Sequence, residues 1–298
     1  MKINIIDVGP RDGFQSVKEF IQTETKIEII EGLIEAGVKK IQAGSFVSPK
    51  AIPQMKDAKE VFQYLLEKYK NSDISFLALV PNYRGAENAY NTGVKEVSYV
   101  ISVSCSHNKA NVNKSHDESF AELEKILKEL PELNVTLDVA TAFGCPFEGE
   151  VELKELLAFI DRAYRIGIRE FNLCDTIGVA YPTQVELTIK TLLEKYNDCS
   201  FDIHIHDTRN MGIVNTLTAI QNGIFNVQAS LGGLGGCPFA PGASGNTSTE
   251  DLVYMLEKMK IETGIDFEKL LKIARIQAQK VNGNFSGHQI NINNQVCN

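Results

Sequence analysis

The sequence of 298 residues lacks any apolar run long enough to cross a membrane, and its first segment, MKINIIDVGPRDG, lacks the apolar core of a secretory signal peptide. Its six cysteines are scattered and form no C-x-x-C pair, which disfavours a zinc ribbon and a disulfide-stapled domain. No low-complexity segment interrupts the chain. We therefore expect a cytoplasmic protein with reduced thiols and no membrane association, built as one catalytic domain over residues 1–298.

The chain also lacks a basic excess, because 30 Lys and Arg residues face 38 Asp and Glu residues and leave a formal net charge of −8. Proteins that bind nucleic acid usually carry a basic field, so no nucleic-acid partner is expected. Hydrophobic residues make up 43% of the chain and charged residues 23%, which is typical of a soluble globular protein. An anionic small substrate stays compatible with this charge if local Lys and Arg side chains receive it.

What the sequence does contain is a repeated alternation of short β-branched runs with amphipathic helical stretches. The runs are almost continuously apolar, which is typical of parallel strands covered on both faces. The predicted strands are 2–8, 38–43, 74–80, 96–103, 134–140, 170–173, 200–206 and 226–231. The predicted helices include 23–36, 118–130, 151–166, 182–196 and 211–222.

Eight strands alternating with helices predict an α/β fold, a (β/α)₈ TIM barrel, with a doubly wound sheet as the structural alternative. Four helices end in a glycine followed by Val or Ile and a strand, in EAGVKKI, NTGVKEV, RIGIREF and QNGIFNV, where a C-cap belongs. Residues 262–298 predict a C-terminal helical extension and a polar tail.

In such a barrel, chemistry collects where strands end and the following loops begin, and the unusual polar residues of this chain stand at those positions. They follow the first, sixth, seventh and eighth strands and are Arg11, Asp12, Asp175, His204, His206, Cys237 and Asn246. Gln42 ends the second strand, in KKIQAGSFVSPK, and is an amide in an otherwise apolar run.

The pair His204 and His206 is the most informative spacing, because residues i and i+2 of a strand share one face. Two imidazoles on one face indicate a divalent metal, and the alternative is a pair of hydrogen-bonded core histidines. If the barrel closes, the eighth strand lies between the seventh and the first, and Asp12 and Asn246 join the two imidazoles. Oxygen ligands combined with imidazole suit Mg²⁺ or Mn²⁺, with Zn²⁺ or Co²⁺ as alternatives.

The neighbouring residues allow both structural and catalytic readings. Arg11 is either an ordinary ion-pair arginine or a guanidinium that stabilises an enolate or carboxylate. Asp175 is either the N-cap of the helix at 182–196 or a site residue. Cys237, in the glycine-rich stretch GGLGGCPFAPGASGN, is either a small buried residue or a proton donor carried on a loop.

Seven segments together resemble the 3-hydroxy-3-methylglutaryl-CoA lyase family of metal-dependent carbon–carbon lyase and synthase barrels. They run in order along residues 3 to about 275: VGPRDGFQ, SFVSPKAIPQM, HNKANVN, GCPFEGE, DTIGVA, HIHDT and GGLGGCPFAPGASGNTSTEDLVYML. The combination of GLGGCP with GASGN favours this branch over the isopropylmalate and citramalate synthases.

The resemblance implies retro-Claisen cleavage of 3-hydroxy-3-methylglutaryl-CoA to acetyl-CoA and acetoacetate, and a homodimer is expected by analogy with such barrels. It implies that Asp12, His204, His206 and Asn246 bind Mg²⁺ or Mn²⁺. Arg11 would stabilise the enolate, Cys237 would take part in proton transfer, and Asp175 would assist near the substrate hydroxyl. Asn108, Lys109 and Lys114 would contact coenzyme A, although the same residues also read as a solvated loop.

Two departures bear on the substrate. The family usually has glutamate where this chain has Gln42, and an amide cannot hold charge or shuttle a proton. The stretch HDTRNMG places Arg209 where HDTYG is typical of the family. A related 3-hydroxyacyl-CoA is therefore an alternative substrate. A condensing synthase for acetyl-CoA and a 2-oxo acid, and a barrel without catalytic activity, are the alternative functions.

Overall fold

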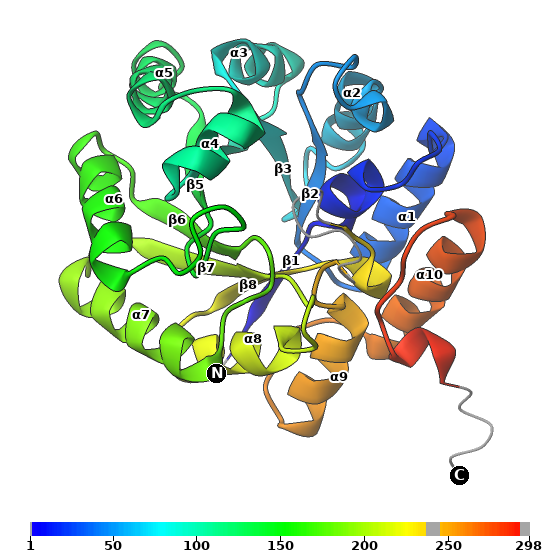
Figure 1. Ribbon diagram of the computed structural model, residues 1–298. Helices are drawn as coiled ribbons and strands as arrows, with labels where there is room; N and C mark the ends of the chain where they lie inside the picture. Colours follow the sequence, from blue (N-terminus) through cyan, green and yellow to red (C-terminus); the bar gives the residue numbers. More distant parts are fainter. Residues whose placement is uncertain (1, 237–244, 293–298) are drawn as a thin grey trace.

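Eight parallel strands close into a barrel whose strand order follows the sequence, β1 to β8, in the computed structural model, which describes residues 2–236 and 245–292 (Figure 1). The strands are β1 (Asn4–Asp7), β2 (Lys40–Ser45), β3 (Ser75–Val80), β4 (Glu96–Ser102), β5 (Asn134–Ala140), β6 (Glu170–Asp175), β7 (Ser200–Ile205) and β8 (Asn226–Ala229). The (β/α)₈ barrel is confirmed, and the doubly wound alternative is wrong, because β1 pairs with both β2 and β8.

Helices surround the barrel (Figure 1). They are α1 (Thr23–Glu35), α2 (Ala58–Lys68), α3 (Tyr83–Thr92), α4 (Cys105–Val112), α5 (His116–Glu129), α6 (Leu153–Arg165), α7 (Pro182–Lys195), α8 (Gly212–Gln221), α9 (Thr249–Lys258) and α10 (Phe267–Lys280). The four glycines that the sequence places at helix ends, Gly37, Gly93, Gly167 and Gly223, have φ between 98° and 106°. Only glycine adopts this backbone without strain, which explains why each of these four helices is followed by a glycine.

Closure of the barrel decides which loops meet. β8 pairs with β1 and with β7, as the sequence predicts, and the pairs Asp7↔Ala229 and His204↔Gln228 set the register. The residues after Asp7 do not continue as a loop, because Gly9–Gly13 form one π-helical turn, η1. Such turns often mark functional positions.

The predicted C-terminal helix is α10, which lies beside α1 on the outside of the barrel (Figure 1). The two helices approach so closely that a Cβ on Gly32 would stand 2.4 Å from Cγ1 of Ile273. Lys280 at the end of α10 also pairs with Glu28 at 2.5 Å. Across the described residues, no helix combines the length and the apolar character that crossing a bilayer requires.

Candidate active site

Asp12, His204 and His206 form a buried cluster at the carboxyl end of the barrel. One ligand atom of each residue lies within 4.8 Å of the others. The strand β7 supplies His204, His206 follows it on the same face, and the buried Ile205 occupies the opposite face. The turn η1 brings Asp12 across β8 to the two imidazoles, so the closure of the barrel assembles a set that the sequence scatters over 195 positions.

Asn246 completes the cluster. Its Nδ2 donates to Oδ2 of Asp12 at 2.9 Å and to the carbonyl oxygen of Leu234 at 3.1 Å. Its backbone is held beside His206, because the amide of Asp207 donates to the carbonyl of Gly245 at 2.8 Å. Both donations use the side-chain nitrogen of Asn246, so its side-chain oxygen remains available as an acceptor.

The cluster fits a divalent cation on an observation of its own. Oδ1 of Asn246 and Nδ1 of both His204 and His206 are buried and have no hydrogen-bond partner. Buried polar atoms are normally satisfied, so three such atoms on the residues of one cluster indicate a missing charged partner. An amide oxygen, two imidazole nitrogens and a carboxylate are ligands that Mg²⁺, Mn²⁺ and Zn²⁺ accept.

The electrostatics of the cluster favour the same reading. Burial opposes ionisation of Asp12, but the nearby Arg11, His204 and His206 outweigh it and lower the pKa of this carboxyl to about 2. Burial, followed by the neighbouring imidazole, lowers the pKa of His204 to about 3. At neutral pH the carboxylate is charged and the His204 imidazole is neutral, which are the protonation states that metal binding requires.

Arg11 is fixed between the cluster and Gln42. One guanidinium nitrogen, Nη1, donates to Asp12, and Nε donates to Oε1 of Gln42. Gln42 is fully buried and donates in turn through Nε2 to the hydroxyl of Ser98 at 2.9 Å. Gln42 therefore holds Arg11 beside Asp12. The prediction that Gln42 ends the second strand is wrong, because it is the third residue of β2, which continues to Ser45.

A cavity of about 230 Å³ opens over the cluster. Arg11, Asp12, His204 and His206 line one side of it, and apolar side chains such as Val47, Leu79 and Val100 line another. Several other polar residues in its wall were not found from the sequence, and Asp138 and His107 are two of them. Asp138 on β5 is buried and accepts from Nδ2 of Asn172 at 2.8 Å, and burial raises the pKa of its carboxyl. His107 on α4 faces the hydroxyl of Ser102 at 2.7 Å.

The signal for Asp138 is present in the sequence but weak. A single aspartate interrupts the apolar run 134–140, and its side of the strand depends on register. Asp138 on β5 pairs with Asn172 on β6, and Cys174, two residues after Asn172, pairs with His204 on β7. Residues two apart on a strand share one face, so Asp138 points into the barrel with the cluster. Sequence alone could not supply that register.

Asp175 ends β6 but does not line this cavity. Its carboxylate accepts from the amides of Val179 at 2.9 Å and Ala180 at 3.0 Å and so closes the loop before α7. The alternative that it caps α7 is wrong, because Tyr181 is the N-cap residue of that helix. Arg209 supports the same loop, since its Nη1 donates to the carbonyls of Ile177 and Gly178.

The residues predicted to contact coenzyme A lie on and after α4, outside the cavity lining. The side chain of Asn108 is buried: Oδ1 accepts from the amide of Ser102 at 3.1 Å, and Nδ2 donates to the hydroxyl of Ser119 at 3.0 Å. These bonds give Asn108 a structural role. Lys109 is exposed and donates to the carbonyl of Asn113 at 3.2 Å. Lys114 pairs with Glu122. Cys237 lies outside the described residues.

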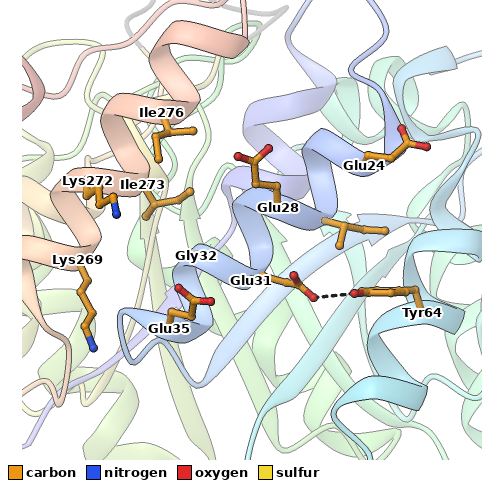
Figure 2. A pocket seen from close by; sticks show the side chains of 11 residues that line it. Glu24, Glu28, Glu31, Gly32, Glu35, Tyr64, Lys269, Lys272, Ile273 and Ile276 are labelled. Carbon is orange, nitrogen blue, oxygen red and sulfur yellow. Dashed lines mark hydrogen bonds between the residues drawn. The ribbon is translucent and has the colours of Figure 1, made fainter.

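A larger cavity of about 600 Å³ lies on the outer helix layer between α1 and α10, as Figure 2 shows. Four glutamates follow one side of α1 there, and Glu31 accepts a hydrogen bond from the hydroxyl of Tyr64 at 3.0 Å. Lys269 and Lys272 stand on the facing helix. Among the described residues that line this groove there is no buried cluster of metal ligands. Cavity size therefore does not identify the chemical site, and the smaller cavity over Asp12 is the one that holds the ligand cluster.

Comparison with known proteins agrees with this geometry. Residues 2–276 match the family described as HMGL-like. The chain is 42% identical over 282 residues to a hydroxymethylglutaryl-CoA lyase of Bacillus subtilis, covering 94% of this chain and 93% of that protein. It is 40% identical over 278 residues to an (R)-citramalyl-CoA lyase of Chloroflexus aurantiacus, covering 90% and 88%.

A solved structure shares the fold closely. An HMG-CoA lyase from Acenitobacter baumannii, in complex with coenzyme A and 3-methylmalate, superposes with a TM-score of 0.90 at 37% identity. The match covers 97% of this chain and 94% of that chain. The similarity therefore spans the barrel as well as the motifs.

Proposed function

Because the chain belongs to the HMGL-like family, we propose that it is a divalent-metal-dependent lyase that cleaves 3-hydroxy-3-methylglutaryl-CoA, or a closely related 3-hydroxyacyl-CoA, to acetyl-CoA and a keto acid. The observation that carries this proposal is the buried cluster of Asp12, His204 and His206 beside Arg11. The relatives described above are lyases by name, so the condensing-synthase alternative is not favoured.

In this proposal Asp12, His204, His206 and Asn246 hold Mg²⁺ or Mn²⁺. The chemistry that such a cation supplies when bound is polarisation of the substrate oxygens. Asp12 and the two imidazoles are buried, and the lower dielectric of a buried site strengthens electrostatic contacts there. The neutral His204 imidazole stays available as a ligand because its pKa is about 3.

Arg11 supplies the positive charge that the leaving enolate needs. Its guanidinium lines the cavity, and its bonds to Asp12 and Gln42 hold it in one orientation. A preorganised donor costs no reorganisation when charge develops in the transition state. Gln42 contributes by positioning Arg11, and as an amide it cannot exchange a proton with the substrate.

We propose roles for Cys237 and Asp175 as well. Cys237, on the glycine-rich segment after β8, would take part in proton transfer. The two amide bonds of Asp175 to Val179 and Ala180 set the shape of the loop beside His206, so its assistance at the substrate hydroxyl would act partly through that loop. Lys109 is exposed at the end of α4 and remains proposed as a contact for coenzyme A phosphates.

The acyl group is the part of the substrate that differs between the named relatives. A hydroxymethylglutaryl-CoA lyase and a citramalyl-CoA lyase lie at similar identity to this chain, so overall identity does not choose between them. The cavity wall carries a carboxyl at Asp138 and amides at Gln15 and Asn111, which makes it more polar than a wall built for an aliphatic chain alone. We also propose a cytoplasmic homodimer of single-domain subunits, which light scattering of the purified protein would test.

The decisive experiment measures acetyl-CoA release by chromatography from 3-hydroxy-3-methylglutaryl-CoA and from citramalyl-CoA. Each substrate is assayed with Mn²⁺ and after metal removal with EDTA, for the parent and for Gln42→Glu. His288→Gln serves as a control, because His288 is an exposed histidine that contacts Asp251 instead of the cluster.

Metal-dependent release from one substrate supports the proposal and names the acyl group. Full activity in the metal-free protein would refute the metal dependence. Release from neither substrate by either protein would refute the proposed substrate class and favour a barrel without this activity. Release by Gln42→Glu alone would mean that the site is intact and that Gln42 tunes it for another acyl group.

A further inference from the structure

A second group of reactive side chains lies outside the barrel, at the start of α4 and α5. Sγ of Cys105, the first residue of α4, stands 3.5 Å from Nδ1 of His116, the first residue of α5. Cys105 is exposed, whereas Cys145 and Cys174 are buried. The mechanism proposed above uses neither Cys105 nor His116.

The hydrogen bonds of His116 decide which way its proton points. Nε2 lies 2.8 Å from the carbonyl oxygen of Ser102, and a carbonyl oxygen only accepts. Nε2 must therefore carry the proton, which leaves Nδ1 as an unprotonated acceptor facing the Cys105 thiol. The rings of Phe120 and Phe159 meet the imidazole edge-on at centroid distances of 6.5 and 5.9 Å and hold its plane.

This arrangement has the three parts of an activated nucleophile: a thiol, a base within reach of it, and a third group that orients the base. Burial, followed by the carboxylates of Glu148 and Asp117, raises the pKa of the Cys105 thiol. The thiol is therefore protonated at neutral pH and depends on a neighbouring base to form the thiolate. His116 Nδ1 is placed to accept that proton.

Cys105 and His116 open into a cavity of about 500 Å³. Its charged rim is mostly acidic, with Glu148, Glu150 and Glu155 exposed around it. Arg162 is the basic residue in the lining, and it already pairs with Asp117 at 2.8 Å. The cavity therefore presents a negative field, which favours cationic or neutral reagents over anionic ones.

We propose that Cys105 and His116 form a base-assisted thiol site that reacts with small cationic or neutral disulfides. His116 accepts the thiol proton, and the Cys105 thiolate attacks one sulfur of the disulfide R–S–S–R. The S–S bond of the reagent breaks, a mixed disulfide forms at Cys105, and the leaving thiolate takes the proton from His116 and departs as RSH. The site does not depend on the proposed lyase function.

The test uses the full-length reduced protein and three disulfides of similar reactivity and different charge. Cystamine is cationic, bis(2-hydroxyethyl) disulfide is neutral and oxidised glutathione is anionic. Peptide mapping by mass spectrometry measures the rate at each cysteine separately, so reaction at Cys237 or Cys297 does not interfere. Cys199 serves as an internal reference, because it is partly exposed and its thiol donates to Oδ1 of Asp198 at 3.9 Å, a carboxylate and not an imidazole.

With cystamine we expect Cys105 to react on the order of tenfold faster than Cys199, because its base is oriented and its access is open. The rate should fall from cystamine to glutathione disulfide, and added salt should narrow that difference. His116→Gln should slow Cys105 on the order of tenfold and leave Cys199 unchanged. His288→Gln is the matched control and should change neither rate.

Three results would overturn the proposal: equal rates at Cys105 and Cys199, an anionic disulfide that reacts as fast as the cationic one, or an unchanged Cys105 rate in His116→Gln. The first two comparisons use the parent protein, so they hold even if the variant folds poorly. Cys105→Ser should abolish labelling at that position and leave acetyl-CoA release unchanged. A loss of release in Cys105→Ser would assign the thiol to the catalytic site instead.

Discussion

Gln42 provides the sharpest test of how the site is held. Replacing Gln42 with methionine keeps the side-chain length and volume but removes both the acceptor and the donor of the amide. Nε of Arg11 then loses its acceptor, and the hydroxyl of Ser98 loses its donor, inside a fully buried environment. The substitution therefore probes two hydrogen bonds with little change in packing.

The two bonds set the expected magnitude. A hydrogen bond to a charged group contributes about 1.5–3 kcal/mol, and a neutral one contributes about 1 kcal/mol. Since both partners stay buried and unsatisfied in Gln42→Met, we expect the free energy of unfolding to fall by about 3 kcal/mol. For a domain of this size that loss lowers the melting temperature by roughly 6–12 °C. Gln42→Glu keeps an acceptor for Arg11 and should lose less.

Thermal and urea unfolding of the parent, Gln42→Met and Gln42→Glu in one buffer measure these differences. Gln63→Met is the matched control, because Gln63 is an exposed glutamine on α2 and should change stability by less than about 0.5 kcal/mol. If Gln42→Met is as stable as Gln63→Met, the amide does not hold Arg11, and the account of Gln42 as a positioning residue is refuted.

Three further predictions concern the cluster, its loop and the pH dependence of stability. Mn²⁺ at a hundredfold excess over its dissociation constant should stabilise the parent by about 2.7 kcal/mol in thermal unfolding. His204→Ala should lose most of that stabilisation. An equal stabilisation of the parent and of His204→Ala by Mn²⁺ would refute the ligand assignment. Asp175→Ala removes two acceptors from backbone amides and should lower the free energy of unfolding by about 2 kcal/mol, with Asp175→Asn intermediate; an unchanged urea midpoint would contradict this. Burial raises the pKa of Asp7 from 3.8 to about 7, so the folded protein keeps a proton that the unfolded chain releases near pH 4. Stability should therefore fall as the pH rises from 4 to 7. A comparison of urea unfolding at pH 5 and pH 8 covers about two of the three pKa units, so Asp7→Asn should remove at most about 3 kcal/mol of the fall measured there.

The barrel could be predicted from the sequence because its signals are local. Continuous apolar runs, amphipathic stretches and a glycine after each of four helices follow from the backbone and the covering of both sheet faces. Strand ends differ from the prediction: the run 226–231 forms a strand only as far as Ala229, and η3 (Leu231–Gly233) then turns the chain. Turn chemistry competes with the apolar pattern at such ends.

Part of the site was also predictable. His204 and His206 share a face because strands have a period of two, and closure of any eight-stranded barrel brings Asp12 beside them. The hydrogen bond from Arg11 to Gln42 and the structural role of Asn108 in α4 were not predictable, since each depends on the orientation of individual nitrogen and oxygen atoms. The resemblance suggested that Asn108 contacts coenzyme A. In the structure its side-chain oxygen accepts from the amide of Ser102, and its side-chain nitrogen donates to the hydroxyl of Ser119.

The sequence by itself determined the alternation of elements, the family and the residue types that gather at the carboxyl ends of the strands, because these follow from local periodicity and order along the chain. Tertiary structure alone decided that Asp138 faces the cavity, that Asp175 faces its own loop and that Cys105 meets His116. Those outcomes depend on register and on contacts between distant segments, where a shift of one residue turns a side chain to the opposite face.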